Sequence, residues 1–312
     1  MNTKSRSRNT KAQSVRRRTW GLRVGLWIAV LMAAVAVVAL FLINRGDDGS
    51  QEASSSRFQP IHTFDTADFH SLVFSPNQPG TVLFGHHGGV QMSRDGGETW
   101  DPVIDEPGRD PMNLVYDPFN PETLYMAGHS VFMKSDDSGT NWASVTSNLP
   151  SLDLHTFAAS PSVANRLYAV PAGSGLYASD DGGMAWTLVS NDVSPGTAAL
   201  VELPDGTLLL AAPDQGLLRS EDGGRTWAAS RSGIEIGVIF TVRASASGDK
   251  LYAGTDRGVY ASTDEGKTWT VTALDDIWAI TIGIDPANPD HILVLNTEGL
   301  LFRSLDGGQT WG

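Results

Sequence analysis

"SRDGGETW", residues 93–100, is the first of six closely similar octapeptides in this chain. The shared pattern is Ser-x-Asp-x-Gly-x-Thr-Trp, with Asn or Ala in place of the Thr in two copies. The other five copies occupy residues 135–142, 179–186, 220–227, 262–269 and 304–311. Their closing tryptophans are spaced 42, 44, 41, 42 and 42 residues apart. A fixed period of this length indicates a repeat architecture in which each repeat is one structural unit.

Each repeat contains short apolar runs separated by turn residues, such as LYAG (251–254) and GVYAS (258–262) in the fifth. Four short strands in about 42 residues correspond to one blade of a β-propeller. Within the octapeptide, the Asp is expected to accept backbone N–H bonds in a tight turn, the Gly to adopt φ > 0, and the Trp to pack between blades. The sequence therefore predicts an all-β, six-bladed β-propeller over residues 58–312.

The sixth repeat is incomplete, because its octapeptide ends at Trp311 and leaves no room for an outermost strand. The segment RFQPIHTF (57–64), which precedes the first blade, has strand character. We expect it to complete the sixth blade and close the ring, which also removes an exposed sheet edge.

The octapeptide resembles the Asp-box (BNR-type repeat) of sialidases, sortilin-type receptors and photosystem II assembly factors. All of these proteins are β-propellers, so the resemblance implies the same fold. In them the motif is a folding device, and it carries no implication of catalysis here.

Composition excludes several kinds of chemistry. The chain contains no cysteine, so disulfides, thiolate metal sites and a cysteine nucleophile are ruled out. Residues 58–312 hold 32 Asp and Glu against 12 Lys and Arg. Such an acidic body repels nucleic acid and anionic membrane surfaces, and neither is expected as a partner of the folded domain.

The N-terminal region has the composition of a membrane anchor. Residues 24–43 are twenty residues without a charge, which is the length of a bilayer-spanning helix. Residues 1–23 hold eight basic residues and no acid, which predicts a cytoplasmic tail and an extracytoplasmic propeller, in a single-pass protein of the cell membrane. Residues 44–57 then form a polar tether. The alternative is a cleaved signal peptide, but the apolar run is longer than usual for one and ends in FLINRGDD, a poor cleavage site.

Histidines are concentrated on one face of three blades. Alignment of the repeats places His62 in the closing strand and His291 on the face of the octapeptides. The other five histidines map to the opposite face of blades one to three, and three aspartates lie beside the starts of the inner strands, where blades four to six have Gly196, Val238 and Trp278. The predicted ligand-binding residues are His70, His86, His87, Met112, His129, His155, Asp68, Asp110 and Asp153.

Three interpretations of this set stay open. The polar residues could cap turns and line a solvated channel mouth, or they could form a pocket for a small organic or glycan ligand. They could also bind a transition metal, copper or zinc, since imidazole combines with carboxylate or thioether in such sites. The metal ligands would then be His70, His86, Met112, His129 and His155.

The arrangement of these residues resembles a family of anchored or secreted bacterial propellers that are usually labelled glycosyl hydrolase or sialidase-like. The resemblance covers residues 58–312. The positions that match the family's motifs are His70, His86-His87-Gly88, Asp110-Pro111-Met112, Gly128-His129 and Asp153-Leu154-His155.

Two function classes follow from these observations. A retaining sialidase needs an arginine triad, a tyrosine nucleophile with a glutamate, and an acid/base aspartate. Here the family's Arg-Ile-Pro element is absent and the tyrosines occupy recurrent strand positions. The first class is therefore a non-catalytic binding or assembly module with a protein or glycan ligand. The second is a glycan-active hydrolase that uses paired carboxylates near Asp105, Asp110 or Asp153.

Overall fold

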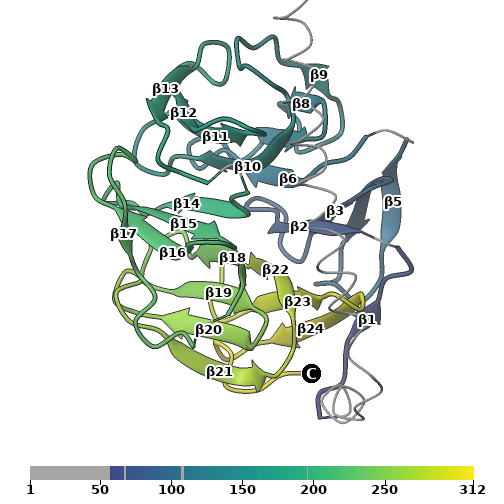
Figure 1. Cartoon of the computed structure of the whole chain (residues 1–312). Helices are drawn as coiled ribbons and strands as arrows, with labels where there is room; N and C mark the ends of the chain where they lie inside the picture. The colour runs from purple at the N-terminus through teal and green to yellow at the C-terminus, as the bar shows by residue number, and fades with distance from the viewer. Residues whose placement is uncertain (1–56, 67, 107–108, 195, 236) are drawn as a thin grey trace, which may run out of the picture. The chain divides into compact units, whose positions relative to one another are not determined.

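Six antiparallel sheets of four strands each surround a common centre, as predicted (Figure 1). This computed structural model describes residues 57–312 except 67, 107–108, 195 and 236. The predicted cytoplasmic tail (1–23), membrane segment (24–43) and nearly all of the tether (44–57) lie outside the described residues. Within the described residues, no helix has the length and apolar character needed to span a bilayer.

Each blade runs from an inner strand near the centre to an outer strand at the rim (Figure 1). The first three blades consist of β2 (Phe69–Phe74), β3 (Val82–His86), β4 (Gly89–Ser93) and β5 (Asp101–Asp105); β6 (Asn113–Tyr116), β7 (Leu124–Gly128), β8 (Val131–Ser135) and β9 (Ala143–Ser144); and β10 (Leu154–Ala159), β11 (Leu167–Pro171), β12 (Leu176–Ser179) and β13 (Thr187–Ser190). The last three consist of β14 (Ala199–Glu202), β15 (Leu208–Ala212), β16 (Gly216–Ser220) and β17 (Ala228–Ala229); β18 (Ile239–Ala244), β19 (Leu251–Thr255), β20 (Gly258–Ser262) and β21 (Thr270–Asp275); and β22 (Ala279–Ile284), β23 (Ile292–Asn296), β24 (Leu300–Ser304) and β1 (His62–Thr63).

The ring is closed by the N-terminal segment, which confirms the prediction for residues 57–64. Strand β1 pairs antiparallel with β24, with Thr63 opposite Leu300. Next to it, Phe64 is buried, and its ring centroid lies 4.2 Å from that of Phe84 in blade one. The closing strand therefore belongs to blade six by its hydrogen bonds and packs against blade one through an aromatic side chain.

The octapeptide forms the same turn in every blade. In the first copy, the Ser93 hydroxyl accepts the Gly97 N–H at 2.8 Å, and Asp95 accepts the Thr99 N–H at 3.0 Å. The Trp100 indole N–H donates to the Gly97 carbonyl at 2.9 Å, and Gly97 has φ +101°. The glycine N–H bond to the serine recurs in the other five copies, at Gly139, Gly183, Gly224, Gly266 and Gly308.

These turns lie on the same face as the loops between the first and second strands of each blade. The Gly96 N–H donates to the Gly80 carbonyl at 2.9 Å, and the same bond joins Ser138 to Glu122 and Gly307 to Asp290. The starts of the inner strands and the turns between the second and third strands therefore face the other way.

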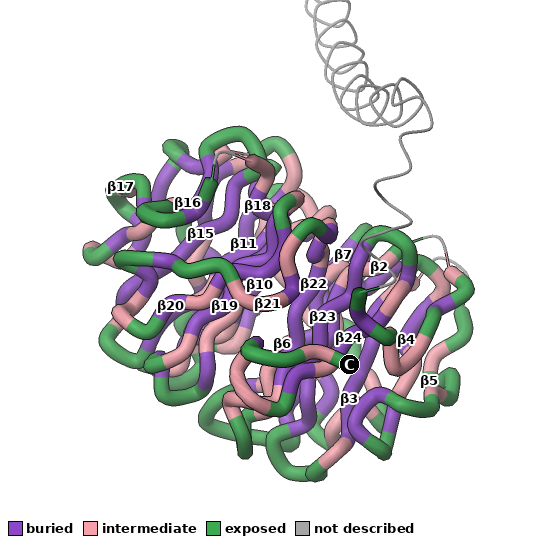
Figure 2. The backbone as a smooth tube through the Cα atoms, turned by 90° about the horizontal axis from the view of Figure 1, so that it is seen from below, coloured by how far each residue is buried: buried purple, intermediate pink, exposed green. Residues whose placement is uncertain are grey.

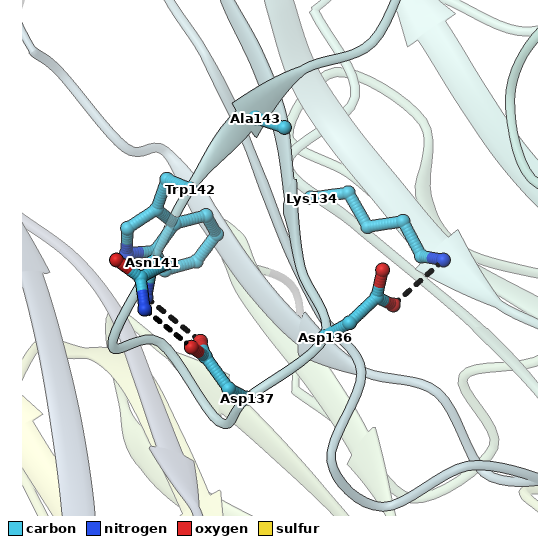
Figure 3. A pocket seen from close by; sticks show the side chains of 6 residues that line it. All are labelled: Lys134, Asp136, Asp137, Asn141, Trp142 and Ala143. Atoms are coloured by element: carbon cyan, nitrogen blue, oxygen red, sulfur yellow. Dashed lines mark hydrogen bonds and ion pairs between the residues drawn. The ribbon is translucent and has the colours of Figure 1, made fainter.

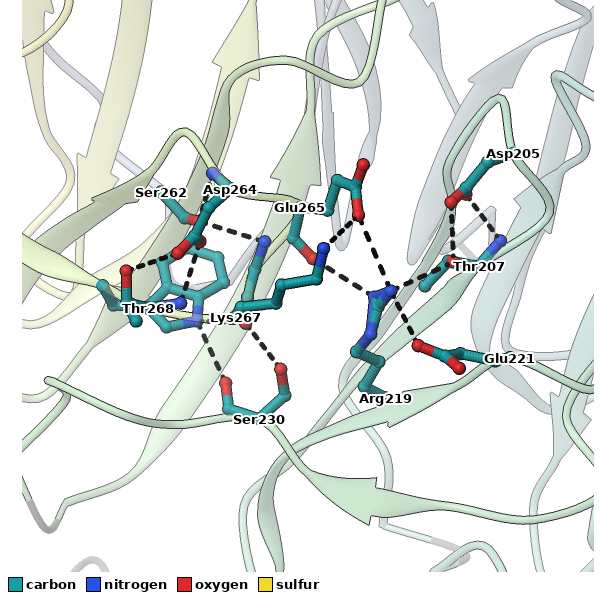
Figure 4. A network of polar contacts seen from close by, with 12 residues as sticks. Asp205, Thr207, Arg219, Glu221, Ser230, Ser262, Asp264, Glu265, Lys267 and Thr268 are labelled. Atoms are coloured by element: carbon teal, nitrogen blue, oxygen red, sulfur yellow. Dashed lines mark hydrogen bonds and ion pairs between the residues drawn. The ribbon is translucent and has the colours of Figure 1, made fainter.

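The core lies between neighbouring blades, where the buried strands pack face to face (Figure 2). Polar contacts add to this packing between blades four and five (Figure 4). Arg219 on β16 is nearly buried and lies 3.0 Å from the Glu221 carboxylate. It also donates to the Glu265 carbonyl of the neighbouring blade at 3.4 Å. This contact fixes one blade against the next and is far from the predicted site residues in the sequence.

Candidate functional site

The predicted site residues come from the starts of β2 and β10, the segment before β6, and the ends of β3 and β7 (Figure 1). Two of these inner strands, β2 in blade one and β10 in blade three, begin with a β-bulge. The register of β2 with β3 shifts between Phe69 and Ser71, and that of β10 with β11 shifts between Leu154 and Thr156. His70 and His155 are thus the extra residues of their strands. A bulge re-aims a side chain locally, which is how these two imidazoles are directed out of the blade.

Two glycines let the segment before β6 approach its neighbours. A Cβ added to Gly128 would lie 1.9 Å from the Asp110 carbonyl oxygen, and one added to Gly85 would lie 2.8 Å from the Pro111 carbonyl oxygen. Only glycine permits such contacts. The Asp110 carbonyl also accepts the His129 N–H at 3.2 Å. Asp110 is therefore held by main-chain packing against the ends of β3 and β7.

Asp110 is the centre of the site. Its side chain is only 5% exposed, and three imidazoles contact its carboxylate. His70 Nε2 lies 2.9 Å from Oδ1, His87 Nδ1 lies 3.0 Å from Oδ2, and His129 Nδ1 makes a short hydrogen bond with Oδ2. One buried carboxylate therefore joins histidines from blade one and blade two.

His129 continues the contacts into blade three. Its Nε2 atom lies 3.0 Å from His155 Nε2 and 3.5 Å from Asp153 Oδ1, and His155 Nε2 lies 3.0 Å from the same Asp153 oxygen. A backbone bridge between His129 and Asp153 holds the two blades together at this point. We call the six connected residues the histidine cluster; they are His70, His87, Asp110, His129, Asp153 and His155.

The electrostatics of the cluster follow from burial and from these contacts. Burial raises the pKa of the Asp110 carboxyl, but hydrogen bonds from His129 and His87 and the nearby charge of His70 outweigh it, so its pKa is lowered. Burial also lowers the pKa of His70, despite the nearby charges of Asp110 and Asp68. An ionised Asp110 carboxylate beside a neutral His70 imidazole is therefore favoured near neutral pH.

Three of the predicted site residues lie outside these contacts. His86 makes other contacts than His87 does: its Nδ1 accepts the Gly88 N–H at 3.1 Å, and its ring stacks on Phe84. Asp68 is exposed and forms no hydrogen bond or ion pair among the described residues, although its charge acts on His70. Met112 is half-buried, and its backbone N–H donates to the Asp110 carbonyl.

The turn at residues 86–89 explains why the two histidines separate. His86 pairs with Gly89 across the β3–β4 hairpin, so His87 and Gly88 form a two-residue turn. Gly89 has φ +137°, and a Cβ there would lie 1.9 Å from the Ile104 carbonyl oxygen of the outer strand. His86 is thus a strand residue, whereas His87 projects from the turn toward Asp110.

Sequence reasoning missed Asn113, which positions the third blade. Its buried side-chain amide donates to the carbonyls of Leu154 and His155, at 3.3 and 3.2 Å. Asn113 occupies an inner-strand position where the fifth and sixth repeats have Thr241 and Thr281, and this departure from the repeat was the available signal.

One other concave region lies at the octapeptide turn of blade two (Figure 3). It is an open hollow of about 400 Å³ that includes Lys134, Asp136 and Trp142. Asp136 is already paired with Lys134 at 2.8 Å. The hollow contains none of the predicted site residues, and most of its lining belongs to the recurring turn, so the histidine cluster stays the candidate site.

Comparison with known proteins supports the fold. No family model matches the chain, and no curated protein does either. Among solved structures, the GH74 enzyme of Niastella koreensis matches with a TM-score of 0.61 and 20% identity, over 82% of this chain and 46% of that one. This chain therefore spans about half the length of that GH74 enzyme.

Two further propellers of similar size also match. YCF48 from Cyanidioschyzon merolae has a TM-score of 0.52 and 16% identity, over 82% of this chain and 87% of that one. A structure of YCF48 bound to D1 peptide also matches. The calcium-binding protein regucalcin from Agrobacterium tumefaciens has a TM-score of 0.57 and 12% identity, over 80% and 94%. At these identities the similarity establishes the propeller fold, which is shared by hydrolases and by binding proteins.

Proposed function

We propose that this chain is a binding module that engages a protein segment through the histidine cluster on the face opposite the octapeptide turns. The observation that carries the proposal is the convergence of four imidazoles from three blades on Asp110 and Asp153. Blades four to six carry Ala198, Phe240 and Ile280 where blades one and three carry His70 and His155. A local departure from an otherwise regular repeat is where a recognition site is expected.

The exposure of the cluster suits binding at the surface. His87 is 67% exposed and His129 is 44% exposed, while Asp110 beneath them is buried. Imidazole edges fixed by a buried carboxylate form a pre-organised set of donors and acceptors, which reduces the entropy lost on binding. The peptide in the YCF48 structure supports a protein segment as the ligand class.

A glycan-active hydrolase is the second candidate. It is favoured by the placement of Asp110 and Asp153 at opposite nitrogens of the His129 ring and by the similarity to GH74 enzymes. Glycoside hydrolysis needs a carboxylic acid with a raised pKa, whereas the pKa of Asp110 is lowered and both of its oxygens face imidazoles. The geometry therefore supports binding better than hydrolysis.

We also propose that residues 24–43 anchor the module in the cell membrane, with the propeller outside the cytoplasm. The support is the sequence alone: twenty uncharged residues that follow eight basic ones.

The test selects ligands from a random peptide library displayed on phage, using the full chain in detergent and including an arm with EDTA. Selected peptides should bind the wild type and lose at least about tenfold in affinity with His87→Ala. The control Met184→Ala, at an exposed side chain on the octapeptide face, should bind normally. Selection of peptides that bind the octapeptide face, or of none, would contradict the proposal. Release of reducing sugar from xyloglucan by the wild type would support the hydrolase instead.

A further inference from the structure

We propose that His129, His155 and Asp153 hold a divalent transition-metal ion of the zinc class, and that the open coordination position of this ion receives the ligand. The inference deepens the proposed function and rests on it for the identity of what binds the ion. The three residues are a set whose ligand atoms all lie within 4.8 Å of one another.

The distances suit one ion. The atoms His129 Nε2, His155 Nε2 and Asp153 Oδ1 form a triangle with sides of 3.0, 3.0 and 3.5 Å. A point about 2.1 Å from all three exists about 1 Å outside their plane, and about 2.0–2.2 Å is the distance that zinc keeps to imidazole nitrogen and carboxylate oxygen. The three separations are therefore compatible with a single shared ion.

The ring of His129 is oriented by a carboxylate, as the rings of metal-binding histidines commonly are. Its Nδ1–H donates to the Asp110 carboxylate, which leaves the lone pair of Nε2 directed toward His155 and Asp153. A carboxylate behind a ligating imidazole fixes the tautomer and the ring orientation. Asp110 would therefore act as a positioning residue for the ion and not as a ligand.

Buried polar atoms without hydrogen bonds also support a bound cation in the cluster. Asp153 Oδ1 is a buried atom without a hydrogen bond among the described residues, and so are Asp110 Oδ1 and His70 Nε2. These last two lie 2.9 Å apart, but their geometry does not satisfy a hydrogen bond. Asp153 Oδ1 has contacts with the His155 and His129 imidazoles but no hydrogen bond, and a cation in the triangle would give it a direct partner.

The site would be open to a ligand. The side chains of His129, His155 and Asp153 are 44%, 34% and 40% exposed. Three protein ligands on a four-coordinate ion leave one position free, as in open zinc sites. A carboxylate or imidazole from a bound protein segment could take that position. This ligand set differs from the one expected from sequence, because His70, His86 and Met112 do not belong to the triangle.

The experiment titrates the metal-free full chain with ZnCl₂ in a calorimeter, with CuCl₂ and CaCl₂ in parallel. One zinc ion should bind per chain, copper should compete for the same site, and calcium should not bind. His155→Ala and Asp153→Asn should each weaken zinc binding about 100-fold or more. His86→Ala is the matched control, since it removes a neighbouring histidine outside the triangle and should leave the affinity unchanged.

The role of Asp110 has its own readout. Asp110→Asn should weaken zinc binding about 10- to 100-fold, and ¹⁵N chemical shifts of the His129 ring should show a changed tautomer balance in the metal-free protein. Melting transitions measured on each variant separate loss of the site from loss of the fold. An Asp110→Asn protein that keeps both the affinity and the tautomer would overturn this role.

The wild type failing to bind zinc, or the variants keeping its affinity, would overturn the metal site. Peptides that still bind to the histidine cluster in EDTA would then leave the proposed function standing. Conversely, zinc bound at this site with no peptide binding to this face would retain the metal site and reject the proposed function.

Discussion

At the scale of single residues, the buried carboxylate of Asp110 and the buried imidazole of His70 couple stability to pH. Burial keeps the pKa of His70 below its value in the unfolded chain, so acidification protonates the unfolded state first. The pKa of Asp110 is also lowered, through its hydrogen bonds, so its contribution is present above the unfolded pKa of about 3.9 and is lost at lower pH. Both groups therefore lower the stability of the folded protein at acidic pH. His70 acts below the pKa of an unfolded histidine, and Asp110 acts at lower pH, below the pKa of an unfolded aspartate.

We expect His70→Gln to reduce the loss of stability between pH 7 and pH 5. In the wild type this loss begins below about pH 6.5, where an unfolded histidine takes up a proton and His70 in the folded protein does not. Urea denaturation of the metal-free protein at both pH values gives the free energy of unfolding. Part of the decrease in the free energy of unfolding between pH 7 and pH 5 should remain, because burial also lowers the pKa of His62 and His86. A decrease equal to that of the wild type would show that His70 does not contribute to this pH dependence.

Gly89 and Gly173 form a matched pair for the turns between second and third strands. Both have positive φ, but a Cβ at Gly89 would lie 1.9 Å from a backbone oxygen, whereas a Cβ at Gly173 meets nothing within 4 Å. Gly173→Ala should therefore cost about 1 kcal/mol, for the left-handed backbone alone. Gly89→Ala should cost about 3 kcal/mol or more, since the outer strand must also move. Equal losses in urea denaturation would refute the assigned contact.

The candidate site was predicted at the level of the face but not of the individual atoms. Alignment of the repeats put His70, His129 and His155 on one face, because a repeat fixes which strand end each residue occupies. In the structure His129 contacts His155, and Asp110 lies between His129 and His70. The alignment could not separate His86 from His87, since that depends on which residue forms the turn. Nor could it show the bulges that aim His70 and His155, because a bulge depends on pairing between strands.

At the scale of elements, the octapeptide explains why the fold could be predicted so fully from sequence. Each turn satisfies its own backbone groups through one serine and one aspartate, and each tryptophan reaches back to a carbonyl three residues earlier. These contacts are local, so they can be recognised without knowledge of the rest of the chain. The spacing between the octapeptides then gives the length of one blade, and their six copies give the number of blades.

Deleting residues 58–64 should destabilise the propeller far more than deleting residues 48–54. The first deletion removes β1 and the buried rings of Phe58 and Phe64, and loss of one such ring alone costs about 3–5 kcal/mol. The second removes the same number of residues from the predicted tether and should change the free energy of unfolding by less than about 0.5 kcal/mol. Thermal and urea unfolding of both proteins provide the comparison. Similar stabilities would mean that the ring does not depend on β1 for closure.

At the scale of the whole molecule, charge is divided between the two ends of the chain. Residues 1–57 hold ten Lys and Arg and three acids, whereas the remaining residues are strongly acidic. The acidic propeller should stay away from an anionic membrane surface, while the basic N-terminal segment is attracted to one. This division agrees with a module held at the membrane by its N-terminal region alone.

The corresponding prediction concerns topology. If the proposed topology holds, a specific protease site inserted within residues 44–57 should be cut on intact cells from outside, releasing the propeller, because eight basic residues before the apolar run favour an N-terminus inside the cell. The same site inserted within residues 1–23 should be cut only after the membrane is permeabilised, which serves as the control. Before cutting, the whole chain should sediment with membranes and resist carbonate extraction, as a spanning helix does and a peripheral protein does not. A soluble form that begins near residue 44 without added protease would instead identify residues 24–43 as part of a cleaved signal peptide, and the propeller would then act as a secreted protein.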